Sequence, residues 1–137
     1  MTRIESKTRP IHLPAEQLFT FLGNFNNFRE IMPPQVSNWQ STEDQCSFNI
    51  QGMADIGLVI EEKLPFSSIR IAATAATPIP LWMTWQFSQQ ESYTDTSLII
   101  DATLNPMLSM MVKTPLTNFV NLLVDKLNEL AESGRIG

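Results

Sequence analysis

The fold is decided by a two-residue alternation that is clearest in the stretch LWMTWQFS, residues 81–88. Successive side chains of a β-strand point to opposite faces, so this period predicts a strand with one apolar face. The large inward side chains would be Leu81, Met83, Trp85 and Phe87. The same period recurs in five further segments, around residues 37–40, 46–51, 56–61, 68–73 and 97–104.

The links between these six segments are short and rich in turn-forming residues. Short links favour antiparallel neighbours, so the segments are predicted to form a meander. Their apolar side chains gather on one face and their polar side chains on the other. The sheet is therefore expected to cover something on one side only.

A helix near the end of the chain is the expected cover. Its apolar residues recur at steps of three and four: Leu116, Phe119, Val120, Leu123, Leu127 and Leu130. This spacing places them on one stripe of a helix. Pro106 suits a first turn and Gly134 a C-terminal cap. Pro115 predicts either a bend near residues 113–114 or a short helix followed by the main one.

The N-terminal part is predicted to form one strand and two short helices. Residues 3–9 alternate as in a half-buried strand, which Pro10 is expected to end. Helical spacing of apolar residues follows over 15–22 and then over 25–32, with Asn24 as the N-cap of the second helix.

This order of elements is accompanied by two local patterns. IHLPAEQLFTFL at residues 11–22 has proline at a helix start followed by Leu-Phe, and NFREIMP at 27–33 leads into VSNW at 36–39. In both, the chain resembles the START-like superfamily, also called SRPBCC, which includes birch-pollen-allergen-like proteins and the polyketide cyclase/dehydrase group.

The resemblance covers nearly the whole chain. It implies an α+β helix-grip fold, in which a curved antiparallel seven-stranded sheet (β-α-α-β6-α) wraps around a long C-terminal helix. It also implies a cavity between the concave face of the sheet and that helix. The fold hosts lipid carriers, hormone receptors, cyclases, oxygenase subunits and co-chaperones, so it names no single function. No catalytic motif of the superfamily is matched.

Composition limits the classes of partner. The 137 residues suit one domain, 1–137, and carry a net charge of −5 without a basic block, which argues against nucleic acid. The N-terminus lacks a signal-like apolar run, and no segment approaches the ~20 apolar residues of a membrane span. Cys46 is the only cysteine. We therefore expect a cytoplasmic protein without stable membrane insertion.

No constellation of catalytic or metal-binding residues is visible. His12 is the only histidine and is expected at the surface, so no metal site is predicted. The five glycines form no phosphate-binding loop, and no cofactor is predicted. Glu61 and Glu62 would point to opposite faces of a strand. Three other charged strand residues are expected on the solvated outer face: Asp55, Arg70 and Asp101. If the strand register differed by one residue, Arg70 or Asp101 would instead be a buried polar anchor.

Candidate ligand-binding residues are large, adaptable apolar side chains on the predicted inner face and at the start of the last helix. Methionine is flexible and polarizable, which suits an apolar ligand. The nine candidates are Met32, Trp39, Phe48, Met83, Trp85, Phe87, Met107, Met110 and Met111. The alternative is that these residues simply fill the core. Trp82, on the opposite face, is expected to mark a patch for self-association or to be exposed by chance.

The sequence thus predicts that the cavity binds a small apolar or amphipathic molecule, such as a lipid-like compound or an aromatic metabolite. Segments near residues 33–34 and 105–106 are expected to gate access. Two alternatives stay open: a cyclase or dehydratase, and a protein-interaction module with a filled core, including a homodimer.

Overall fold

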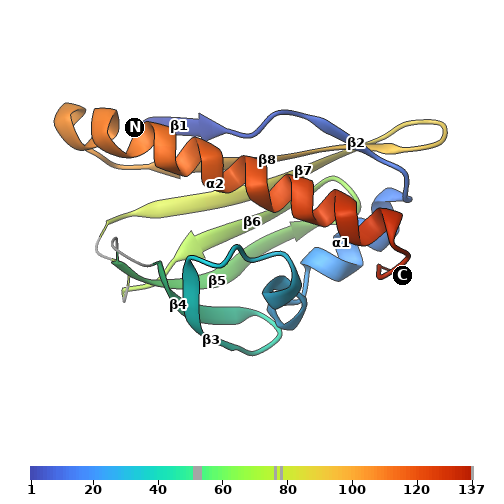
Figure 1. Ribbon diagram of the computed structural model, residues 1–137, viewed down its shortest axis with the longest axis horizontal. Helices are drawn as coiled ribbons and strands as arrows, with labels where there is room; N and C mark the ends of the chain where they lie inside the picture. The colour runs from blue at the N-terminus through green and yellow to red at the C-terminus, as the bar shows by residue number, and fades with distance from the viewer. Residues whose placement is uncertain (51–53, 76, 78, 137) are drawn as a thin grey trace.

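The computed structural model describes residues 1–50, 54–75, 77 and 79–136, and it is an α+β structure with one sheet and a long C-terminal helix (Figure 1). In chain order the elements are β1 (Thr2–Glu5), β2 (Arg9–Ile11), α1 (Ala15–Leu22), the 3₁₀ helix η1 (Phe25–Glu30), β3 (Val36–Ser41), β4 (Gln45–Ile50), β5 (Ala54–Leu64), β6 (Ser68–Ala73), β7 (Leu81–Gln89), β8 (Thr94–Ala102) and α2 (Pro106–Glu132).

The sheet is the predicted antiparallel meander, and the N-terminal strands β1 and β2 pair with its last strand, β8. Its order is β1-β8-β7-β6-β5-β4-β3, and β2 also pairs with β8. The predicted pairing of consecutive strands is confirmed from β3 to β8. The structure has eight strands because the expected first strand is divided into β1 and β2, while the helix-grip arrangement is as predicted.

The division of the first strand has a visible cause. The Ser6 hydroxyl accepts a hydrogen bond from the Leu98 backbone N–H at 2.9 Å. In a regular antiparallel ladder a backbone carbonyl would accept this bond. The next backbone N–H, that of Lys7, turns away from β8 and donates to the Asn121 side chain of α2 at 2.8 Å. Pro10 lies inside β2 and does not end the strand, since an edge strand tolerates a residue without an N–H.

The opposite edge, β3, is also irregular. Val36 and Ser37 pair with β4 in one register, and Gln40 and Ser41 pair in another. Between them Asn38 has a φ of 55°, in the left-handed region that asparagine tolerates better than most residues. β3 is therefore bent rather than flat.

Helix α2 lies along the concave face of the sheet (Figure 1). Asn105 caps its start by accepting a hydrogen bond from the Leu108 N–H at 2.8 Å, and Gly134, with a φ of 75°, follows its end. The helix continues through Pro115 without a break, so the alternative of two separate helices is wrong.

The two halves of α2 differ in burial. In the second half Val120, Leu123, Val124 and Leu127 are fully buried in the core. Contrary to expectation, α2 as a whole is long and apolar enough to cross a membrane, and only 17% of its most apolar 18-residue stretch is buried. The second half of α2 packs in the core, and its first half is largely exposed.

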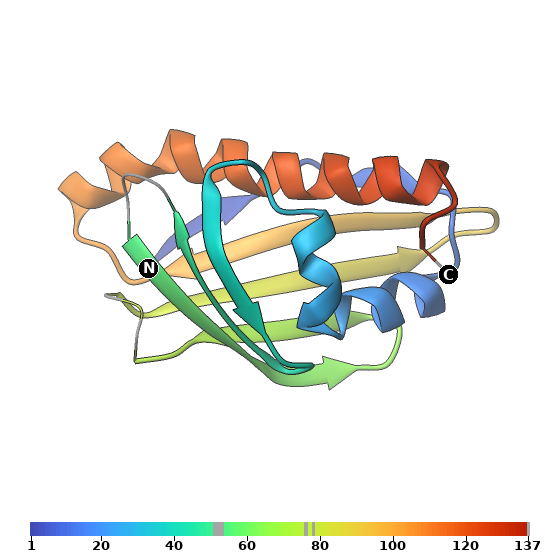
Figure 2. The ribbon, with the colours of Figure 1, turned by 60° about the horizontal axis from the view of Figure 1, so that its bottom comes forward.

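Helices α1 and η1 cover the end of the concave face that lies under the second half of α2 (Figure 2). η1 is a 3₁₀ helix and not the α-helix expected over 25–32, and Asn24 caps it as predicted by accepting from the Asn26 N–H at 2.9 Å. The Phe25 and Phe28 side chains of η1 are fully buried. An aromatic cluster thus fills this end of the interior and leaves the end under the first half of α2 less filled.

Candidate ligand-binding cavity

A cavity of about 370 Å³ lies between the concave face of the sheet and the first half of α2. This volume is within the usual range of small-molecule sites. The walls come from β4, β5, β7, β8 and α2 and from the segment before β7. The lining residues are Phe48, Ile50, Ile56, Thr77, Ile79, Leu81, Met83, Ile100, Leu104, Leu108, Val112, Leu116 and Phe119.

Local periodicity explains why these side chains converge. The strand residues come from alternate positions, such as Leu81 and Met83 of β7, which share one face of the sheet. On α2, the lining residues Leu108, Val112 and Leu116 are spaced by four and so lie above one another on one side of the helix. The apolar stripe through which the second half of α2 packs in the core therefore continues along the first half, where it lines the cavity.

The cavity is almost wholly apolar. Thr77 is the one polar side chain among the described lining residues, and its hydroxyl already accepts one hydrogen bond and donates another. Its Oγ1 accepts from the Gly57 N–H at 2.9 Å and donates to the Gly57 carbonyl at 3.0 Å. No ionisable side chain contributes to the lining that the structure describes. Ligand selection here would rest on shape and on removal of apolar surface from water.

The structure places the nine candidate residues in three groups. Phe48 and Met83 line the cavity. Four others lie outside its lining, in or against the core: Met32, Trp39, Trp85 and Phe87. Trp85, for example, is fully buried with the Phe28 ring at 6.3 Å, and Trp39 stacks on the Phe48 ring at 5.3 Å.

The third group consists of the methionines at the start of α2. Met107, Met110 and Met111 are 71%, 83% and 66% exposed and point away from the cavity. Their neighbours Leu108 and Val112 are the ones that line it. Extending the apolar stripe backwards from Leu116 in steps of four would have identified both of these residues from the sequence.

The charged residues of the outer face form pairs. Glu61 accepts from Arg70 at 2.9 Å, and the Arg70 guanidinium lies 5.7 Å from the centre of the Trp82 ring, which is half-buried. Asp101 faces outward as expected but is not solvated. It is 9% exposed and pairs with Arg3 at 2.9 Å, and this hydrogen bond and charge raise the pKa of Arg3.

His12 and Cys46 both lie outside the described cavity lining. His12 is exposed as expected, with the Tyr93 ring at 6.0 Å. Within residues 1–50, 54–75, 77 and 79–136, no group of three His, Cys, Asp or Glu side chains could hold a metal ion. Cys46 is buried, and desolvation raises the pKa of its thiol to about 12 although a backbone hydrogen bond from Leu58 partly opposes this.

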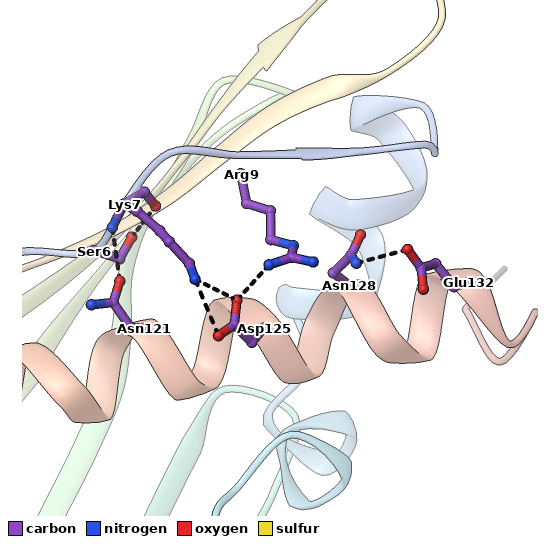
Figure 3. A network of polar contacts seen from close by, with 7 residues as sticks. All are labelled: Ser6, Lys7, Arg9, Asn121, Asp125, Asn128 and Glu132. Carbon is purple, nitrogen blue, oxygen red and sulfur yellow. Dashed lines mark hydrogen bonds and ion pairs between the residues drawn. The ribbon is translucent and has the colours of Figure 1, made fainter.

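A polar network fixes the second half of α2 (Figure 3). Asp125 pairs with Lys7 at 3.2 Å and with Arg9 at 2.8 Å, both from the segment that includes β2. One turn earlier, Asn121 accepts the Lys7 backbone N–H. Asn128 donates to Glu132 at 3.0 Å on the same helix. The contacts of Asn121 and Asp125 tie the second half of α2 to the N-terminal segment. The first half is joined to β1 by a hydrogen bond that the Thr2 hydroxyl donates to the Ser109 hydroxyl at 3.0 Å, and it covers the cavity through apolar side chains.

Comparison with known proteins gives the fold a name. No protein-family model and no curated protein sequence matches the chain. Among solved structures, a START superfamily protein from Mycobacterium smegmatis matches with a TM-score of 0.72 and 11% identity, over 97% of this chain and 99% of that one. The chain has a START-like fold.

Two further solved structures match the fold of this chain. The protein XoxI from Bacillus cereus matches with a TM-score of 0.75 and 14% identity, over 96% of both chains. The Aha1 dimer from Colwellia psychrerythraea matches with a TM-score of 0.70 and 13% identity, over 98% of this chain and 99% of that one. At these identities the likeness concerns the fold alone, so the function is argued from the cavity.

Proposed function

We propose that residues 1–137 form one START-like domain that binds a small apolar or amphipathic molecule, lipid-like or aromatic, in the cavity under α2. The observation that carries this proposal is the unfilled volume of about 370 Å³ with its apolar lining. An interior of this kind gives up packing contacts that a filled core would have. A ligand would restore those contacts and gain roughly 25 cal/mol for each Å² of apolar surface removed from water.

The polarity of the lining restricts the ligand. Because the Thr77 hydroxyl already donates its proton to the Gly57 carbonyl, and no other described lining side chain is polar, a hydrogen-bond acceptor of the ligand would find no donor side chain there. Burying such a group without a partner is unfavourable. An amphipathic ligand would therefore place its apolar part in the cavity and keep its polar end in water. Access would involve the segment near Asn105, where α2 begins.

The two alternative functions receive less support. A cyclase or dehydratase needs an acid or a base beside its substrate, and the described lining residues supply neither. An interaction module with a filled core does not account for the cavity. The buried, neutral thiol of Cys46 is in keeping with a reducing compartment, and we propose a cytoplasmic location.

The test is to extract purified protein with organic solvent for mass spectrometry and to weigh the intact protein by native mass spectrometry. In parallel, the ligand-free protein is titrated with the fluorescent apolar probe N-phenyl-1-naphthylamine. A bound apolar compound at fixed stoichiometry, or saturable probe binding, is the expected result. Protein that is ligand-free and does not bind the probe would contradict the proposal.

A matched pair of variants locates the binding. Val112→Phe places a phenyl ring in the cavity, whereas Thr114→Phe makes a similar change of a β-branched residue at an exposed position of the same helix turn. We expect Val112→Phe to weaken probe binding about tenfold or more, which corresponds to roughly 1.4 kcal/mol, and Thr114→Phe to leave it unchanged. Equal effects of the two changes would place the probe elsewhere.

A further inference from the structure

The first turns of α2 extend past the end of the sheet, as Figures 1 and 2 both show. On these turns the three outward side chains Met107, Met110 and Met111 are largely exposed, and we call them the methionine tip. Met110 and Met111 follow Met107 by three and four positions, so the three side chains share one side of the helix, turned away from the cavity-lining stripe. Further along this side, Thr114 and Asn118 are exposed and polar, and the next exposed apolar side chain on the helix is Leu122.

The charges around the methionine tip set it apart from the rest of the chain. Residues 102–124 contain a single charged side chain, Lys113, although the chain as a whole carries a net charge of −5. Asp101 and Asp55, which precede this part of the chain on β8 and β5, lie on the outer face of the sheet and have partners. Asp101 is paired with Arg3, and Asp55 accepts from Asn49. An anionic or zwitterionic surface would therefore meet apolar side chains and one cation here, and no free acid of α2.

We propose that the methionine tip docks on the surface of a lipid bilayer, so that the ligand passes between bilayer and cavity beside Leu108. The part concerning ligand passage rests on the function proposed above. Flexible methionine side chains adapt to disordered acyl chains. A short apolar protrusion on an uncharged helix start is enough for shallow insertion at the membrane interface.

The size and shape of the tip favour a bilayer over a second copy of the chain. A stable protein interface removes roughly 800 Å² of surface on each partner. Three methionine side chains on two helix turns are far smaller than that, and the polar residues Thr114 and Asn118 follow them on the same side. The first turns of α2, which carry the tip, extend beyond the sheet (Figure 2), and such a protrusion suits insertion into a fluid layer better than contact with a flat protein face.

The location of the tip links it to the cavity. Leu108, between Met107 and Met110 in sequence, is 40% exposed and also lines the cavity. A bilayer that receives the tip would therefore lie against a side chain of the cavity wall. An apolar ligand could then leave the acyl layer without crossing water, which removes most of the cost of its transfer.

The experiment measures binding of the full chain to vesicles of phosphatidylcholine alone and with a quarter phosphatidylglycerol, by flotation. The variant Met107→Gln/Met110→Gln/Met111→Gln keeps side-chain length and helix propensity but removes the apolar surface. The control Leu64→Gln/Leu122→Gln changes two other exposed apolar residues, one in β5 and one farther along α2. We expect the triple variant to lose about tenfold or more in vesicle binding and the control to match the unaltered chain.

A second measurement does not depend on the triple variant. An environment-sensitive fluorophore is attached to the new cysteine of Met110→Cys or of Lys126→Cys. The native Cys46 is only 6% exposed, so the reagent should not label it. The label at position 110 should shift to the blue when vesicles are added, and the label at position 126 should not.

The outcomes separate this inference from the proposed function. Absence of vesicle binding, or equal binding by the triple variant and the unaltered chain, would overturn the docking proposal. So would a dimer in sedimentation experiments that the triple variant loses, since the tip would then belong to a second copy. Vesicle binding that depends on the tip, in a protein whose cavity takes up no apolar probe, would support docking and overturn the ligand-binding function instead.

Discussion

The buried thiol of Cys46 makes stability depend on pH in a defined window. Cys46 is on the inner side of β4, 6% exposed, and burial raises the pKa of its thiol from 9.0 to about 12. In the unfolded chain the thiol loses its proton above about pH 9, whereas in the folded protein it keeps the proton up to about pH 12. Between these values the unfolded state binds fewer protons, so the free energy of unfolding falls as pH rises.

The magnitude follows from the width of the window. At pH 10.5 the unfolded thiol is about one and a half units above its pKa, and the folded thiol is still protonated. Each unit is worth roughly 1.4 kcal/mol, so this one group should lower the free energy of unfolding by about 2 kcal/mol between pH 8 and pH 10.5.

Comparison with Cys46→Ala isolates this contribution from the titration of lysine and tyrosine residues. Urea unfolding is followed by tryptophan fluorescence for both proteins at pH 8 and pH 10.5. The unaltered protein should lose about 2 kcal/mol more than the variant over this range. If both proteins lose the same amount, the thiol is not shielded from water and the packing described around β4 is wrong.

Two predictions concern neighbouring residues of α2. Leu123→Ala should lower the free energy of unfolding by about 2–5 kcal/mol in urea unfolding, because the side chain is fully buried in the core; a loss under 1 kcal/mol would mean that α2 is not packed there. Asp125→Ala should lower the free energy of unfolding by only about 1 kcal/mol or less, because the Asp125 side chain is 38% exposed although it pairs with Lys7 and Arg9. If high salt did not reduce this loss, its origin would not be electrostatic.

Much of the fold could be predicted from the sequence because the patterns that specify it are local. The alternation in residues 81–88 fixes which face of β7 is apolar, and Met83 accordingly reaches the cavity. The division of the first strand could not be predicted in this way. It depends on the Lys7 N–H meeting Asn121 of α2, a residue more than a hundred positions later in the chain.

The cavity lining could be predicted only in part, for a similar reason. Met83 and Trp85 share one face of β7, and periodicity cannot tell which of them lies under α2 and which under η1. The Phe28 ring of η1 takes the space beside Trp85, so this residue belongs to the core. At the start of α2, the distinction between Val112 inside and Met111 outside follows from the helix phase set by Leu116, which is present in the sequence but is not given by the methionine content.

The irregular edges of the sheet bear on how the protein behaves at high concentration. An exposed, regular edge strand can pair with the edge of another molecule and so start aggregation. Here the ladder of β3 changes register around Asn38, and the opposite edge is interrupted between β1 and β2, where the Lys7 N–H is already bonded to α2. Neither edge offers an incoming strand a long, flat row of free backbone groups. The sheet is thus protected against edge-to-edge association without being closed into a barrel.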